Sequence, residues 1–361
     1  MGLGVERLSL RDWRNFEHKD VSLGAGVTIL HGSNARGKTN TVEALQVLTT
    51  GGSFRKARPV QLVREGCERG RASMRLTGDG RVVDVSCTVS EGRRRFEVNG
   101  KGCHAGDVSQ TLMSVLFTPD DLSLVKRGAR MRRDEIDSFG RCVSPSFGHV
   151  LDTYQRTVDQ RNRLLKSEFC DSSLIDAWDA SISVGGAALL DARLRLFARL
   201  AEKVEEIYAD MSEGEDLACA YRCSLGEEAT RLGRDEVRRL MEERLRRGRS
   251  EDLRRGQTLV GPHRDDLSFF VGGRDARTYG SQGQQRTVAL AWKMAEVKVA
   301  EEITGARPLL LLDDVMSELD GSRRDAALGL VEGGMQTVVT TVNLGYFPRE
   351  LLDGAEVISY G

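Results

Sequence analysis

A loop with the spacing GxxxxGK[ST] is the segment of this sequence best suited to chemistry. It comprises Gly32, Ser33, Asn34, Ala35, Arg36, Gly37, Lys38 and Thr39, with Asn40 directly after it. A strand-like apolar run precedes the loop and a helical pattern follows, so backbone N–H groups and a helix N-terminus would surround a phosphate. We expect Lys38 to bind the β- and γ-phosphates of ATP and to act in catalysis, and the Thr39 hydroxyl to bind Mg²⁺.

An acidic pair follows four consecutive leucines. The apolar run 309–312 predicts a strand, which places Asp313 and Asp314 at its end. We expect Asp313 to hold Mg²⁺, directly or through water, and Asp314 to be the catalytic residue that orients and polarises the attacking water. The alternative is a core strand that ends in two turn aspartates. The phosphate-binding loop in the same chain favours ATP hydrolysis.

The hydropathy pattern predicts the elements that must position these residues. Strands are expected at 5–10, 26–31, 267–271, 309–312 and 337–341, and an antiparallel β-meander at 71–100. Helices are expected at 38–49, 282–304 and 323–333, and apolar residues recur at helical spacing across 120–256. We therefore expect a head segment at 1–120, an inserted helical lobe at 121–255 and a second head segment at 256–361.

Composition and charge limit the classes of partner. The 361 residues have a net charge of −1, so any nucleic-acid surface must be a local patch. The seven cysteines are odd in number and contain no CxxC pair, which indicates reduced thiols in a cytoplasmic protein. No run of 18 apolar residues and no signal-peptide pattern occurs, so no membrane partner is expected.

Residues 279–286 resemble the signature loop of ABC ATPases. Ser281 provides the hydroxyl of that loop, Gln282 stands where the family has its first signature glycine, and Gly283 keeps the second. Residues 317–320 resemble the D-loop of the same family. The resemblance implies that Ser281, Gln282 and Gly283 face the ATP bound by a second copy, so that ATP binding creates a homodimer with Ser281 in a catalytic role. The alternative for Ser281 is a helix N-cap, and one hydroxyl can serve both purposes.

Two parts of the ABC pattern are missing or indistinct. Many family members have a His after the strand that follows the D-loop, whereas this chain has Val342 and Asn343 there. A Thr, an Asn or a main-chain group would then sense the γ-phosphate, and slow turnover is expected. Gln61 is a candidate for the family's glutamine loop, but a lone Gln after Pro59 is more typical of solvated surface.

Several stretches identify the chain as a member of the RecF family. An Arg14-Asn15-Phe16 element and a head split by an insertion are similar to SMC relatives, but the insertion lacks sustained heptads. The stretches that resemble RecF are 53–55, 117–122, 160–166, 261–267, 281–285 and 311–320. The resemblance implies an α/β fold: an ABC-type P-loop ATPase head with a mixed sheet and antiparallel β-meander, plus an inserted all-α lobe without a long coiled coil.

The resemblance also implies a function and partners. RecF-like proteins bind double-stranded and gapped DNA as ATP-dependent dimers, and they cooperate with RecR and RecO to load the RecA recombinase. Arg14 and Asn15 are expected to contribute to the nucleotide site. A detached ABC-transporter ATPase subunit, a P-loop kinase and an ATP-gated binding module without turnover are the alternatives. Stimulation of ATP hydrolysis by DNA would separate these classes.

Three basic clusters are candidates for DNA contact. They lie at 93–95, 130–133 and 238–255, and the last is interrupted by acidic residues. Such mixed charge is typical of a solvated helix face, and phosphate contacts without base stacking are the alternative. We expect His263 to form a hydrogen bond that holds the inserted lobe against the head rather than to bind a metal.

Overall fold

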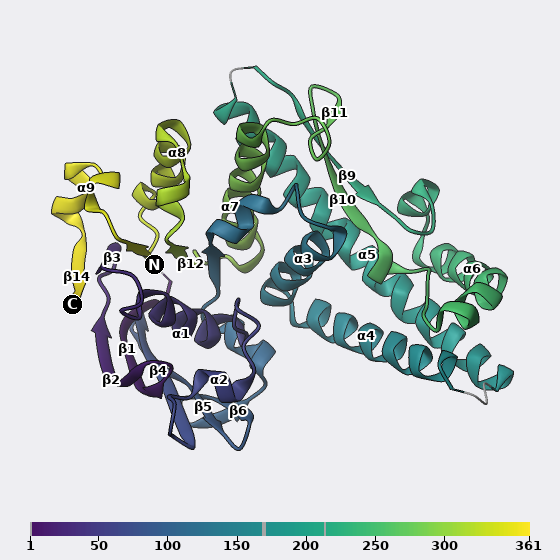
Figure 1. Ribbon diagram of the computed structural model, residues 1–361, viewed down its shortest axis with the longest axis horizontal. Helices are drawn as coiled ribbons and strands as arrows, with labels where there is room; N and C mark the ends of the chain where they lie inside the picture. The colour runs from purple at the N-terminus through teal and green to yellow at the C-terminus, as the bar shows by residue number, and fades with distance from the viewer. Residues whose placement is uncertain (1, 168–170, 213) are drawn as a thin grey trace. The chain divides into compact units, whose positions relative to one another are not determined.

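The computed structural model describes residues 2–167, 171–212 and 214–361, and it divides into two compact units (Figure 1). The first, called the head below, comprises Met1–Leu122 and Ala289–Gly361. The second, called the lobe, comprises Ser123–Val288. The expected return to the head at 256 is wrong, because residues 256–288 belong to the lobe.

An antiparallel sheet in the head has the strand order β2-β1-β4-β5-β6-β7. Its strands are β1 (Gly4–Trp13), β2 (Phe16–Ser22), β4 (Arg69–Gly78), β5 (Arg81–Ser90), β6 (Arg93–Val98) and β7 (Lys101–Cys103). The pairs Asp79-Gly80, Glu91-Gly92 and Asn99-Gly100 all have positive φ. Two-residue turns of this kind match the twist of hairpin strands, which explains the predicted meander.

A parallel sheet in the head has the order β14-β3-β13-β12-β8. Its strands are β3 (Val27–Gly32), β8 (Ser114–Phe117), β12 (Leu309–Asp313), β13 (Thr337–Thr341) and β14 (Glu356–Tyr360). Every residue of β12 and β13 is buried, as expected for central parallel strands covered on both faces. The helix α1 (Lys38–Thr50) contacts strands of both sheets, so it joins them into one core.

Short elements complete the head. They are α2 (Pro59–Leu62), η1 (Ala105–Gln110), η2 (Pro119–Ser123), η5 (Val315–Glu318), α8 (Gly321–Glu332), η6 (Leu344–Tyr346) and α9 (Arg349–Gly354). The helix α7 (Gln282–Thr304) begins in the lobe, and its remainder belongs to the head. No helix in the described ranges has an apolar stretch sufficient to cross a lipid bilayer. Cys67, Cys87, Cys103, Cys219 and Cys223 are free thiols, and Cys170 lies outside the described residues.

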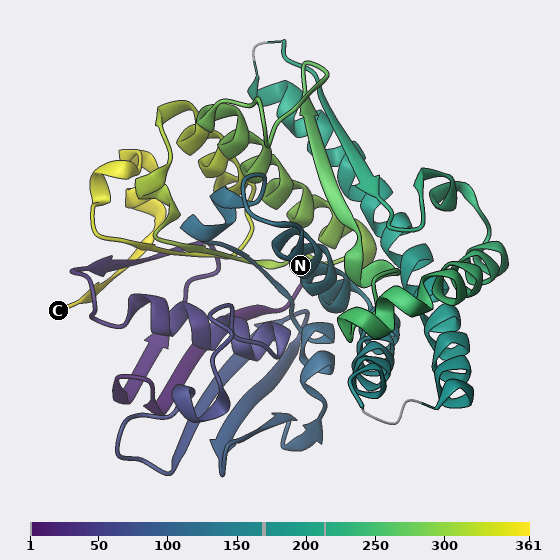
Figure 2. The same ribbon diagram turned by 45° about the vertical axis from the view of Figure 1, so that its right-hand side comes forward.

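The lobe is built on helices but also contains a sheet. Its helices are α3 (Ala129–Val143), α4 (Pro145–Leu165), α5 (Ser172–Met211), η3 (Glu227–Arg231), α6 (Arg234–Arg255) and η4 (Pro262–Arg264). Its strands β9 (Leu217–Arg222), β10 (Asp266–Val271) and β11 (Arg274–Asp275) form an antiparallel sheet, and Figure 2 shows β9 and β10 alongside α5.

The expectation of an entirely helical insertion is therefore wrong at β9. This strand pairs with β10, a strand far from it in the sequence, and Leu217 lies opposite Val271. The segment is short and its apolar alternation is weak, so only the partner strand stabilises the extended conformation. The same pairing keeps residues 256–288 in the lobe.

Candidate nucleotide-binding site

The loop between β3 and α1 has the backbone conformation of a phosphate cradle. Gly32 has φ +151 and Gly37 has φ +101, and Ala35 between them has φ 65. A Cβ at Gly32 would lie 2.2 Å from the carbonyl oxygen of Tyr360, and one at Gly37 would lie 2.3 Å from Cζ of Phe16. Both glycines are therefore required by close packing as well as by φ.

Lys38, the first residue of α1, is buried against this loop. It is 6% exposed, and Nζ donates to the carbonyl oxygens of Gly32 at 2.5 Å and Ser33 at 2.9 Å. Burial lowers the pKa of Lys38, while the charges of Asp314 and Asp313 act in the opposite direction. A desolvated ammonium at a helix N-terminus is an environment that favours a bound polyanion.

Asp313 and Thr39 meet at the end of β12. The carboxylate of Asp313 is 5% exposed and accepts a hydrogen bond from Oγ1 of Thr340 at 2.8 Å. Burial raises the pKa of Asp313, and hydrogen bonds from the side chains of Thr340 and Thr39 oppose that shift. Mg²⁺ in phosphate sites is held by one or two protein oxygens together with phosphate and water. This carboxylate and hydroxyl therefore fit the expected metal.

Asp314 is the more accessible of the two acids. Burial raises its pKa, Lys38 lowers it, and Glu318 raises it. Its backbone has φ 55, and its N–H donates to Oγ1 of Thr340 at 2.9 Å. The chain thus turns sharply at the end of β12, and this turn separates a buried carboxylate from a partly exposed one.

Arg14 is held by a buried acid on α1. Its guanidinium forms two hydrogen bonds with Glu43, of 2.7 and 2.6 Å, and the Glu43 side chain is fully buried. Ser53 donates to the same carboxylate at 2.5 Å, and Arg55 lies 3.6 Å from it. The guanidinium expected at the nucleotide is therefore already engaged, and Glu43 joins three segments of the head.

Asn15 belongs to a neighbouring chain of hydrogen bonds. Its Oδ1 accepts from Nδ2 of Asn40 at 2.7 Å, and Oδ1 of Asn40 accepts from Arg55 at 2.7 Å. A Cβ at Gly37 would meet Nδ2 of Asn15 at 2.9 Å, so Asn15 lies against the phosphate loop.

The signature segment lies at the start of α7, in the lobe. The hydroxyl of Ser281 accepts from the N–H of Gln284 at 3.1 Å, and the N–H of Ser281 donates to Oε1 of Gln284 at 2.8 Å. This reciprocal pair is a helix cap, as the alternative interpretation predicted. Ser281 and Gln282 are nonetheless exposed, and Gly283 is partly buried. These three residues belong to the lobe, whereas Lys38, Thr39 and Asp313 belong to the head.

The D-loop segment and the sensor candidates have local roles. Asp320 caps α8 by accepting from the N–H of Arg323 at 3.1 Å. Asn343 accepts from the N–H of Gly345 at 2.8 Å, and Thr341 is 1% exposed. Gln61 is exposed and accepts from the N–H of Arg58, which agrees with the surface interpretation.

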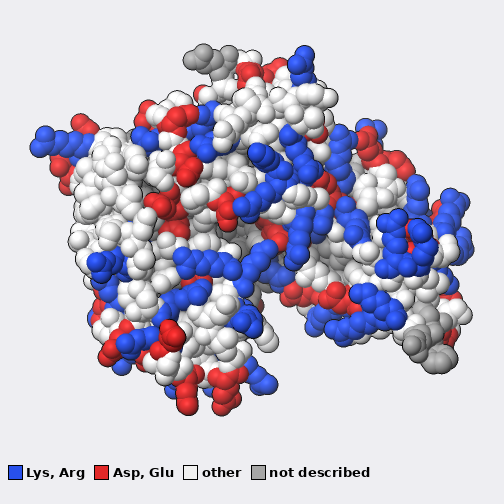
Figure 3. All heavy atoms as spheres, in the orientation of Figure 1, with Lys and Arg blue, Asp and Glu red and all other residues white. Residues whose placement is uncertain are grey.

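Most of the basic candidates for DNA contact are paired with acids. Arg132 is buried and forms an ion pair of 2.7 Å with Asp266, so it is a structural residue. Along α6, ion pairs join Arg238 to Glu242 and both Arg254 and Arg255 to Glu251. Figure 3 shows mostly Lys and Arg, with Asp and Glu among them, over the part that carries α6. This arrangement is that of a solvated helix face.

His263 differs from the expectation. Its Nδ1 lies 2.7 Å from the hydroxyl of Tyr154 and its Nε2 lies 2.9 Å from the carbonyl oxygen of Thr258, and all three residues belong to the lobe. The expected hydrogen bond between lobe and head is therefore wrong. His263 instead joins α4 to the segment before β10.

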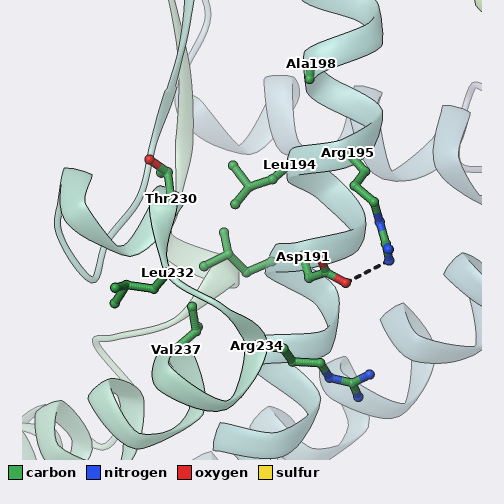
Figure 4. Close-up of a pocket in the computed structure, with 9 residues that line it drawn as sticks. Asp191, Leu194, Arg195, Ala198, Thr230, Leu232, Arg234 and Val237 are labelled. Carbon is green, nitrogen blue, oxygen red and sulfur yellow. Dashed lines mark ion pairs between the residues drawn. The ribbon is translucent and has the colours of Figure 1, made fainter.

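A cavity of about 270 Å³ in the lobe is separate from the candidate nucleotide-binding residues (Figure 4). It lies between α5 and the start of α6, and its lining includes Leu194, Leu232 and Val237 with the ion pair of Asp191 and Arg195. None of its lining residues belongs to the phosphate loop, the acidic pair or the signature segment.

Sequence reasoning missed Glu43 and the contact of Thr340 with Asp313. Glu43 is a lone acid among Val42, Ala44 and Leu45, all of which are buried. A charge on such an apolar helix is a usable indication of a buried ion pair. Thr340 is a hydroxyl within the apolar β13 strand, level with Asp313 in the register. That indication exists only once the strand pairing is known.

Comparison with known proteins agrees with this geometry. The family model "RecF/RecN/SMC N terminal domain" matches residues 4–350. A DNA replication and repair protein RecF from Pelotomaculum thermopropionicum is 38% identical over 95% of this chain and 94% of its own length. The RecF protein of Bacillus subtilis is 34% identical, over 96% of this chain and 95% of its own length.

Solved structures give the same result. The recombination mediator protein RecF with ATPrS, described as part of the RecFOR pathway, has a TM-score of 0.90 and 29% identity, covering 96% of this chain and 94% of the other. An Smc head domain from Pyrococcus furiosus, 16% identical with a TM-score of 0.55 and covering 99% and 93%, shares the fold alone. This chain belongs to the RecF family of SMC-like ABC-type ATPases.

Proposed function

We propose that this chain is an ATP-dependent DNA-binding protein of recombinational repair and replication restart, and that a second copy of the chain completes its nucleotide site. The observation that carries the proposal is the set of groups gathered in the head. A buried Lys38 in a glycine loop lies in the electrostatic field of Asp313 and Asp314, and Thr39 shares a hydrogen bond with Asp313. The solved relative with the same fold, described as RecF with ATP, supports ATP as the ligand.

In this proposal the phosphate chain of ATP lies along the loop from Gly32 to Thr39. The backbone N–H groups and the α1 N-terminus bind its oxygens, and Lys38 exchanges its carbonyl partners for phosphate. Arg14 and Asn15 support the site through Glu43 and Asn40. Thr39 and Asp313 hold Mg²⁺, which when bound neutralises charge on the β- and γ-phosphates.

Asp314 activates the attacking water. Its raised pKa makes the carboxylate a better acceptor for a proton from water, and its partial exposure gives that water access. Asp313 is buried and hydrogen-bonded, so it is suited to holding a cation rather than to exchanging protons.

Ser281 acts on the ATP of the partner copy. Because its hydroxyl is exposed while it caps α7, it presents both oxygen and helix N-terminus to an incoming γ-phosphate. Two copies then enclose two ATP molecules through an isologous interface, and Gln282 and Gly283 contribute to it. Slow hydrolysis resets the dimer.

The dimer binds double-stranded and gapped DNA in the cytoplasm, and it works with RecR and RecO in loading RecA. The solved relatives are described as RecF of the RecFOR pathway, and this description supports the assignment. DNA binding is expected to use phosphate contacts, so affinity should fall steeply with salt. Affinity that is flat between low and moderate salt would contradict this. A detached ABC-transporter subunit would instead show no stimulation of ATP hydrolysis by DNA.

The decisive experiment is the solution mass of Asp314→Asn by light scattering, with and without ATP and Mg²⁺. This variant keeps the shape of the side chain and the binding loop, but it lacks the proton acceptor. A doubling of mass only with ATP is expected. A monomer under both conditions, with and without added DNA, would contradict the two-copy site.

A further inference from the structure

The hydroxyl of Thr340 contacts both members of the acidic pair. Oγ1 lies 2.9 Å from the backbone N of Asp314 and 2.8 Å from Oδ1 of Asp313. The amide can only donate, and a hydroxyl has one proton. Thr340 therefore accepts from Asp314 and donates to Asp313, and the direction of both hydrogen bonds is fixed.

The position of Thr340 is set by the parallel sheet. It lies directly opposite Asp313 in the pairing of β13 with β12, and it is 0% exposed. A β-branched side chain in a packed strand has little freedom at χ1. The oxygen that joins the two acids is consequently held by the central strands of the head rather than by a loop.

The contact with Asp314 stabilises an unfavourable backbone. Asp314 has φ 55, a left-handed conformation that non-glycine residues adopt at a cost. Its carbonyl oxygen accepts from Oγ of Ser317 at 2.8 Å, so hydrogen bonds hold this turn on both sides. Without Thr340, the N–H of Asp314 would lose its partner in a partly buried contact, and Oδ1 of Asp313 would lose one in a buried contact.

We propose that Thr340 is a positioning residue for ATP hydrolysis. It fixes the orientation of the Asp313 carboxylate, and it fixes the turn from which Asp314 reaches the attacking water. The inference rests on the proposed function, since it requires these two aspartates to have different roles. It also explains how adjacent residues can be kept in different environments.

Thr337 offers a matched control on the same strand. It is also 0% exposed, but its hydroxyl donates to the carbonyl oxygen of Met335 at 3.0 Å and contacts neither aspartate. Thr340→Val and Thr337→Val therefore remove the same atom from the same buried strand. Thr340→Ser keeps the hydroxyl, and Thr340→Cys replaces it with a weakly bonding thiol of similar size.

The experiment measures kcat and KM for ATP, the Mg²⁺ concentration for half-maximal binding of a fluorescent ATP analogue, and hydrogen exchange at the Asp314 amide. Thr340→Val should lower kcat roughly 10- to 100-fold with little change in KM. It should also raise the Mg²⁺ requirement and speed exchange. Thr337→Val should resemble the wild type, and Thr340→Ser should restore most of kcat. If Thr340→Val does not fold, Thr340→Cys should show the same changes in weaker form.

Equal effects of Thr340→Val and Thr337→Val, or none from Thr340→Val, would overturn the inference. A wild-type chain that binds but never hydrolyses ATP would instead overturn the proposed function. The Mg²⁺ requirement and the amide exchange would then still decide whether Thr340 orders the two aspartates.

Discussion

In the lobe, Arg161 on α4 forms ion pairs of 2.6 Å with both Asp179 on α5 and Asp252 on α6. In the head, the buried ammonium of Lys38 donates to the neutral carbonyls of its own loop. The first arrangement pairs the buried charges with opposite charges on other helices, so it specifies how helices pack. The second leaves a desolvated cation that a bound anion can neutralise by direct contact. Buried charge therefore supports the packing of helices at Arg161 and is available to a ligand at Lys38.

A second pair in the lobe follows the same rule. Arg193 on α5 forms two hydrogen bonds of 2.7 Å with Asp137 on α3, and it donates to the carbonyl oxygen of Pro262 at 2.6 Å. Strong electrostatic contacts alone are thus a poor guide to function. What separates the head is a buried lysine in a glycine loop whose hydrogen bonds go to backbone carbonyls rather than to a carboxylate.

The largest expected effect is on stability, in the lobe. Arg161→Leu leaves Asp252 buried without its cation, while Asp179 loses one of two cations and keeps Arg249 at 2.8 Å. The variant should lower the free energy of unfolding by about 3–5 kcal/mol. Chemical denaturation followed by circular dichroism measures this. The control Arg247→Gln, on the exposed face of α6, should change it by less than about 0.5 kcal/mol. A loss in Arg161→Leu as small as in the control would show that the buried pairs do not hold the lobe.

A pH effect of similar size is expected from His263. Burial lowers the pKa of His263 to about 4, against 6.5 for an unburied His. Because the unfolded chain binds the proton more readily, stability is fully present above about pH 6.5 and is lost as the pH falls toward 4, by about 3 kcal/mol. Unfolding free energies measured from pH 7 to pH 4 test this. His263→Asn should have a shallower slope, and an unchanged slope would assign the acid sensitivity to other groups.

In the head, the larger effect should be on binding. Lys38→Met should change the unfolding free energy by no more than about 1 kcal/mol, because lost hydrogen bonds and relieved desolvation oppose each other. The affinity for ATP should fall roughly 100-fold, since charge-assisted contacts with phosphate are lost. Titration with a fluorescent nucleotide and denaturation of the same preparation measure the two quantities. If Lys38→Met lost much stability but kept its affinity for ATP, Lys38 would be a structural residue like Arg161 in the lobe.

A small stability effect is expected at Ser281, whose cap and proposed partner contact can be separated. Ser281→Ala should cost about 1 kcal/mol by removing the cap of α7, and Ser281→Asn should recover most of it. Both variants should lose ATP-dependent dimer formation, measured as solution mass with ATP and Mg²⁺ in the Asp314→Asn background. Dimers that form normally in both would leave Ser281 with the cap alone.

Local spacing was enough to predict the elements that carry the proposed phosphate-binding groups. Three elements were predicted from residues adjacent in the sequence, and the structure has each at the expected place. They are the loop from Gly32 to Thr39, the strand that ends at Asp313, and the helix that begins at Gln282. Turn residues such as Asn99 and Gly100 likewise fix hairpins locally. In these segments the conformation depends on neighbours in the sequence, so pattern and propensity suffice.

Contacts between distant segments were decided by tertiary structure alone. The bond from Thr340 to Asp313 spans 27 residues and that from Arg14 to Glu43 spans 29, and neither spacing has a periodicity that the sequence could reveal. The segment 217–222 was expected to be helical, but it pairs with β10 as the strand β9. The lobe therefore ends at residue 288 rather than at the expected residue 255. The sequence determined which chemical groups are present and which turns and helices carry them. Only the packing of buried strands and helices decided which hydroxyl orders the two aspartates, because a buried polar group bonds to whatever the fold brings within reach.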